Sequence, residues 1–67
     1  MSIKPTIRQK LYLFIKSYSE THKVTLTNIH LWADHNHISR GEMGYELQLL
    51  KEIGAIYYDK KYGWRAK

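Results

Sequence analysis

The sequence predicts an α+β fold made of three helices followed by a C-terminal β-hairpin. Apolar residues recur at the spacing of one helix face in residues 5–18 and again in residues 39–53, with a weaker helical segment between them. Residues 55–58 are rich in β-forming side chains, and a polar turn separates them from a second short stretch of the same kind. We expect one domain over residues 1–67, in the order helix, short strand, helix, helix, strand, strand.

The composition indicates a small, positively charged intracellular domain. Its 67 residues lie near the lower limit for a self-sufficient core, and the absence of cysteine excludes disulfides and thiolate zinc sites. No apolar run approaches the ~20 residues of a transmembrane helix, and the N-terminus lacks the order of a signal peptide, so we expect a cytoplasmic protein with no membrane partner. Eleven Lys and Arg against six Asp and Glu give a net charge of +5, which favours polyanionic partners.

The first helix is predicted to run from Pro5, which suits a first helical turn, to Tyr18. Its inward face is formed by residues at steps of four, three, one and three, namely Ile7, Leu11, Phe14, Ile15 and Tyr18. The other face is basic and carries Arg8, Lys10 and Lys16, with Lys4 just before the helix.

Val24 is predicted to form a short extended segment, and Thr25 to cap the second helix. This helix has weak intrinsic propensity, so tertiary packing must hold it through Leu26, Ile29 and either Trp32 or Ala33. We expect it to end around Asp34 or His35, with Asn36 in a left-handed conformation and the apolar Ile38 turned inward.

The third helix is predicted over residues 39–53, with Ser39 as N-cap, Glu42 completing a capping box and Gly54 ending it. Its inward face is expected to hold Met43, Leu47, Leu50 and Ile53. The opposite face, which we expect to meet a partner, carries Arg40, Gly41, Gly44, Tyr45, Gln48, Lys51 and Glu52.

The hairpin is predicted from a turn over residues 59–63 followed by a second strand over residues 64–66. Alternation along the strands directs Tyr58 and Trp64 inward and Tyr57 and Tyr62 outward. All four rings could stack on bases or sugars, and packing in the core is the alternative for Tyr58 and Trp64.

One string of residues resembles the recognition helix of small bacterial and phage transcription regulators. It consists of Ile38, Ser39, Arg40, Gly41, Met43, Leu47, Leu50, Gly54 and Ile56. With the element order over residues 5–66, it resembles the winged helix-turn-helix superfamily, in which the hairpin is the wing. Two features depart from that pattern. The turn at residues 34–37 is longer than usual, and the third helix has net charge −1, from two basic and three acidic residues.

The resemblance implies a double-stranded DNA-binding protein, such as a small transcriptional regulator or accessory factor. The third helix would enter the major groove, where the predicted base contacts are Arg40, Gly41, Tyr45 and Gln48. The first helix and the wing would hold phosphates through Lys4, Arg8, Lys10, Ser39, Lys60, Lys61 and Arg65. For the basic residues, the alternative is an ordinary solvated surface. A lone domain of this size binds weakly unless it forms a homodimer or binds cooperatively.

Other functions are weighed against this one. The acidic third helix with its two glycines favours a protein-binding module, such as an inhibitor or adaptor, and RNA or single-stranded binding through the wing is a third alternative. His30 and Asp34 could chelate a metal, but a solvated turn explains this region better, so we predict no metal and no cofactor. No nucleophile with a partnered base and no phosphate-cradling glycine loop is present, so we predict no enzyme.

Overall fold

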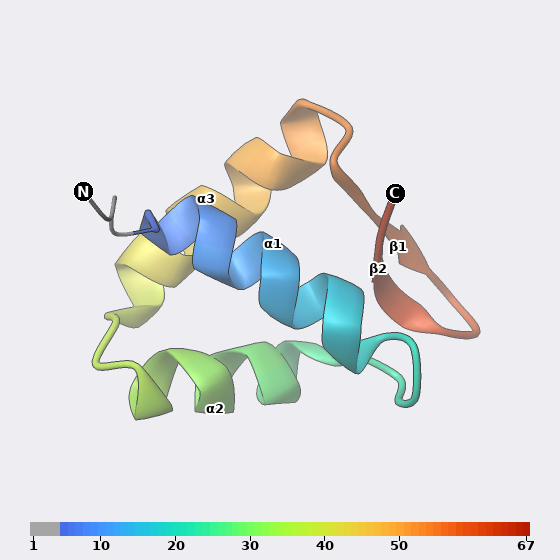
Figure 1. Cartoon of the computed structure of the whole chain (residues 1–67), viewed down its shortest axis with the longest axis horizontal. Coiled ribbons are helices and arrows are strands. Elements are labelled where there is room, and N and C mark those ends of the chain that lie inside the picture. The colour runs from blue at the N-terminus through green and yellow to red at the C-terminus, as the bar shows by residue number, and fades with distance from the viewer. Residues whose placement is uncertain (1–4) are drawn as a thin grey trace.

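The computed structural model describes residues 5–67 and has an α+β architecture of three helices and one antiparallel hairpin (Figure 1). Figure 1 is viewed from the side of α1, with α3 passing behind it, α2 along the bottom and the hairpin at one end. The three helices and the hairpin confirm the predicted layout. Their bounds are α1 Ile7–Tyr18, α2 Leu26–His35, α3 Arg40–Glu52, β1 Ile56–Asp59 and β2 Gly63–Ala66.

All three helices contribute to one apolar core, because each turns its regularly spaced apolar residues toward the centre of the molecule. The buried side chains are Leu11, Ile15, Val24, Ile29, Ala33, Ile38, Met43, Leu47, Leu50 and Ile56. Ile7, Phe14 and Tyr18 are partly buried against this cluster, so the predicted inward face of α1 is confirmed.

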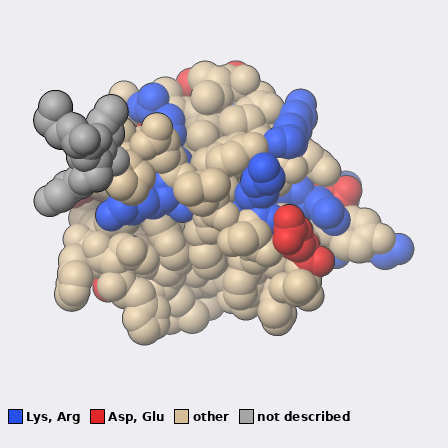
Figure 2. Space-filling model, in the orientation of Figure 1, with Lys and Arg blue, Asp and Glu red and all other residues tan. Residues whose placement is uncertain are grey.

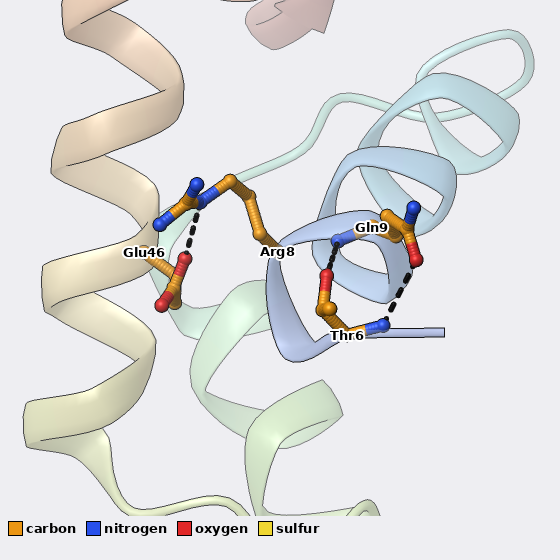
Figure 3. A network of polar contacts seen from close by, with 4 residues as sticks. All are labelled: Thr6, Arg8, Gln9 and Glu46. Carbon is orange, nitrogen blue, oxygen red and sulfur yellow. Dashed lines mark hydrogen bonds and ion pairs between the residues drawn. The ribbon is translucent and has the colours of Figure 1, made fainter. Parts of the chain in front are cut away.

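Hydroxyl side chains fix the start of each helix. Thr6 caps α1 and forms a reciprocal capping box with Gln9 (Figure 3), so Pro5 precedes the cap and is not in the first turn as predicted. Thr25 caps α2 as predicted. Ser39 caps α3 by accepting from the Glu42 N–H at 3.2 Å. The predicted box is incomplete, because the Glu42 carboxylate accepts from the Ser39 hydroxyl at 3.3 Å instead of from its backbone N–H.

The connection between α2 and α3 turns at His37, which has φ 57°, and not at Asn36 as predicted. Asn36 stays near the helical region because its side-chain amide and its backbone N–H both donate to the Trp32 carbonyl. The turn at His37 lets the Ile38 N–H donate to the Ala33 carbonyl at 2.9 Å. Ile38 is thereby buried, as predicted.

Three residues predicted to face inward are exposed, and two of them, Ile53 and Leu26, lie at the ends of helices. Ile53 is 68% exposed, since it caps α3 beyond the last turn that packs on the core. Leu26, the first residue of α2, is also exposed. Tyr58 is 55% exposed and contacts Trp64 edge to face, with 5.3 Å between ring centroids, at the wall of an open groove. Trp64 is half-buried against the core, and Tyr57 and Tyr62 point outward as predicted.

The hairpin is joined to the start of α2 through Val24. This residue forms a single parallel β-bridge with Gly63, and its carbonyl accepts from the Trp64 N–H at 2.9 Å. The expected short strand is therefore one bridging residue. At the other end of β2, the Tyr12 hydroxyl donates to the Lys67 carbonyl at 2.9 Å. Within residues 5–67, no helix has both the length and the apolar character that crossing a membrane requires.

Candidate nucleic-acid interface

The outer face of α3 is open to solvent along its length. Its inward face packs on the core through Met43, Leu47 and Leu50, which leaves the opposite side uncovered. Gly41, Tyr45 and Gln48 lie together on that side, and Tyr45 is 63% exposed. A Cβ atom added at Gly41 or at Gly44 would meet nothing within 4 Å, so a partner can approach the helix backbone closely there.

Arg40 lies in the first turn of α3, with 67% of its side chain exposed. Its guanidinium is 4.0 Å from the Asp34 carboxylate at the end of α2, which is the limit of an ion pair. A contact this long and exposed holds the side chain weakly, so Arg40 stays available to a partner. Of the predicted base-contacting residues, Gly41, Tyr45 and Gln48 thus share one helix face, whereas Arg40 lies in the first turn on the side toward α2.

The three carboxylates of α3 all have partners within the protein. Glu46 accepts from the Arg8 Nε atom at 2.7 Å, across the boundary between α3 and α1 (Figure 3). Glu52 accepts from the Gln48 amide at 3.2 Å, and Glu42 accepts from the Ser39 hydroxyl. The Arg8 pair matters most for the interface, because it offsets one negative charge of α3 and occupies a residue predicted to contact phosphate.

A groove of about 430 Å³ runs between the start of α2, the second half of α3 and the hairpin. Two cations and two aromatic rings contribute to its walls, which consist of Lys23, Val24, Thr25, Leu26, Lys51, Tyr58 and Trp64. The Lys51 ammonium lies 6.0 Å from the centroid of the Trp64 ring. Gly44, Gln48 and Lys51 follow one another at steps of four and three, so one side of α3 leads into the groove.

The tip of the hairpin is basic and its shape is set by Asp59. The Asp59 carboxylate accepts from the backbone N–H groups of Lys61 at 2.7 Å and Tyr62 at 3.0 Å. These two bonds hold the pKa of Asp59 below its ordinary value, and the bond from Tyr62 has the larger effect. The Lys61 ammonium and the Arg65 guanidinium lie over the Tyr62 ring at 5.3 Å and 5.2 Å. With the exposed Lys60, the hairpin offers three cations near one turn.

The predicted basic side of α1 lies apart from the outer face of α3. The two helices pack their inward faces together, so their solvent-exposed faces point to different sides of the molecule. Lys10 and Lys16 are exposed on α1. Figure 2, drawn from that side, shows Lys and Arg over α1 and towards the hairpin. Lys4 lies outside the described residues.

Sequence reasoning missed Lys23, and it placed Lys51 on the partner face of the third helix without assigning it a contact. Neither belongs to a charge run, and Lys23 reaches the groove only because Val24 is bridged to the distant Gly63. The spacing of Gly44, Gln48 and Lys51 places Lys51 on one side of α3. Only the position of the hairpin shows that this side faces a groove.

Among residues 5–67, no three His, Cys, Asp or Glu side chains are placed to hold a metal ion. His30 is half-buried in the middle of α2, and Asp34 is exposed near its end, where it faces Arg40. We compared the chain with protein-family models, with curated proteins and with solved structures, and none of the three comparisons gave a match.

Proposed function

We propose that this chain is a double-stranded DNA-binding protein of the winged helix-turn-helix type. It would be a small transcriptional regulator or accessory factor, with α3 in the major groove and the hairpin as the wing. The observation that carries the proposal is the continuity of one surface. The open face of α3 leads directly into a groove lined by cations and aromatic rings, and the groove leads to the basic hairpin.

Base recognition would come from the outer face of α3. Gln48 and Arg40 carry the amide and guanidinium groups that recognise adenine and guanine edges in the major groove. Gly41 and Gly44 would let the helix backbone sit close to the base edges. Tyr45 would add an exposed ring able to contact a thymine methyl group.

Backbone contacts would come from the groove and the hairpin. Lys23 and Lys51 line the groove, where a DNA strand passing from α3 to the wing would meet both. Lys60 and Lys61 extend this positive surface at the hairpin tip. Phosphate contacts of this kind position a duplex and supply most of the salt-dependent affinity. Lys10 and Lys16 would contribute long-range attraction only, because their helix face points elsewhere.

Duplex binding measured over a salt series tests this assignment. Each phosphate contact contributes about 0.9 to the slope of log affinity against log salt, so replacing Lys23 and Lys51 by alanine should reduce the slope by roughly 2. The matched control replaces Lys10 and Lys16, which removes the same net charge from α1. It should leave the slope nearly unchanged. Equal effects of the two double variants would show that net charge, and not the groove, governs binding.

A protein-binding module is the second candidate, and one observation favours it. Tyr45, Leu49 and Ile53 follow one another at steps of four and give α3 an apolar stripe, of which Tyr45 and Ile53 are exposed. A helix with this stripe and a net charge of −1 could dock on an apolar or basic protein surface. If no duplex binds even at low salt, this function replaces DNA binding.

A further inference from the structure

Four aromatic rings form a continuous stack along the seam between α1 and α2. Trp32 stacks on Phe14 at 5.6 Å, Phe14 on Tyr18 at 5.3 Å, and Tyr18 on His22 at 4.6 Å, measured between ring centroids. The interplanar angles lie between 21° and 25°, so neighbouring rings are roughly parallel and offset. Phe14, Tyr18 and Trp32 are only half-buried, which leaves part of each ring at the surface.

A hollow of about 300 Å³ lies beside this stack, lined by Phe14, Tyr18, Asn28, Leu31, Trp32 and His35. We call this surface the aromatic face. Leu31 stands at its rim and is 52% exposed. The aromatic face therefore combines an apolar projection with a hollow wide enough for an apolar side chain. That combination is what a self-complementary contact between two identical surfaces requires.

The aromatic face is also poor in charge. Helix α2 contains no Lys or Arg, and its one carboxylate, Asp34, faces Arg40 of α3. Figure 2 shows the same contrast, because the surface over α2 carries no Lys or Arg on the viewed side. Each chain has a net charge of +5, so two copies that met through α1 or the hairpin would bring like charges together. Approach through α2 reduces that repulsion, with Lys10 of α1 one helical turn before Phe14.

We infer that the aromatic face is a contact between two copies of this chain. Leu31 of each copy fills the hollow of the other, and the edges of Trp32 and Tyr18 enclose it. Aromatic anchors in a charge-depleted centre are typical of the residues that dominate binding energy in protein interfaces. A standard interface buries about 800 Å² per partner, which is about one sixth of the 4944 Å² surface of the chain. The inference is independent of DNA binding, because the contact leaves the outer face of α3 uncovered.

Salt gives this contact a distinctive behaviour. Screening weakens the repulsion between two chains of charge +5 but leaves apolar burial largely intact. Self-association should therefore tighten as salt is added. An interface built from ion pairs would loosen instead, as would any complex held together by contaminating nucleic acid.

Sedimentation of the purified, nucleic-acid-free chain from about 10 µM to about 1 mM tests the inference. The wild type should pass from monomer to dimer, and more readily at higher salt. Leu31→Glu should raise the dissociation constant at least about tenfold, the ratio that 1.4 kcal/mol represents. Leu13→Glu is the matched control, because Leu13 is 57% exposed but lies in the groove between α1 and α3.

Three results would overturn the inference: a wild type that stays monomeric throughout, a dimer that Leu31→Glu leaves intact, or equal disruption by the two variants. Circular dichroism checks that each variant keeps its helices. If Leu31→Glu does not fold, Leu31→Ala gives the same comparison with a smaller change in the dissociation constant. Loss of DNA binding with the dimer intact would count against the proposed function alone.

Discussion

At the scale of single residues, the placement of the hairpin depends on Gly63. Its φ of 77° lies in the left-handed region, and a Cβ atom there would collide with the Val24 carbonyl oxygen. We predict that Gly63→Ala lowers the free energy of unfolding by about 2 kcal/mol or more, measured by chemical denaturation.

Gly41→Ala is the matched control for that substitution. Gly41 lies in helical conformation in α3, and an added Cβ meets nothing within 4 Å. The change should raise the free energy of unfolding by up to about 1 kcal/mol, because alanine favours a helix more than glycine does. Similar destabilisation by both substitutions would contradict the described contact between Gly63 and Val24.

Asp59 gives the hairpin turn a predictable dependence on pH. Its pKa is lowered in the folded chain because the carboxylate accepts from the Tyr62 and Lys61 N–H groups. A group of this kind stabilises the fold above its ordinary value of 3.8 and loses that contribution as the pH falls through its lower folded value.

Thermal unfolding of the wild type and of Asp59→Asn checks this prediction. Asparagine keeps an oxygen acceptor but cannot titrate, so the variant should be less stable at neutral pH. The difference in melting temperature should shrink as the pH falls below 3.8. A difference that is independent of pH would show that the charge of Asp59 does not stabilise the turn.

At the scale of one element, α3 combines two glycines with an open outer face. Gly44→Ala should stabilise the fold by about 0.5–1 kcal/mol, since nothing lies within 4 Å of the added Cβ. If Gly44 permits close approach of a duplex, the same change should weaken DNA binding. Denaturation and duplex titration of this variant, beside Gly41→Ala, should show stability and affinity moving in opposite directions. Unchanged affinity for both variants would mean that the glycines have no role in docking.

The elements themselves were predictable because each has a local cause. Apolar residues at steps of three and four predicted the inward faces of α1 and α3, and β-forming residues predicted the hairpin. Two of the errors fall at the ends of helices. Ile53 and Leu26 fit the helical spacing but lie beyond the neighbouring elements that would bury them. Periodicity states which side a residue is on, whereas burial also requires something to cover it.

The candidate site was predictable only in part, for a related reason. Helical spacing was enough to group Gly41, Tyr45 and Gln48 on one open face of α3. It gave no means of placing Lys23, because that residue reaches the groove through the bridge from Val24 to Gly63. Nor did charge alone show that α1 turns its basic side away from the outer face of α3.

At the scale of the whole molecule, the described residues form surfaces of different character. The outer face of α3, the groove and the hairpin form one continuous surface with polar, glycine and basic residues. The seam of α1 and α2 presents stacked aromatic rings with few charges. We propose that DNA binds the first surface and that a second copy of the chain binds the aromatic face.

Backbone amide NMR spectra recorded as a short duplex is added show which surface of the protein meets DNA. The account predicts saturable shifts at Gly41, Gly44, Gln48, Lys51 and Lys61, with little change along residues 27–35 of α2. Shifts confined to α1 and α2, or no saturable shift at low salt, would contradict it.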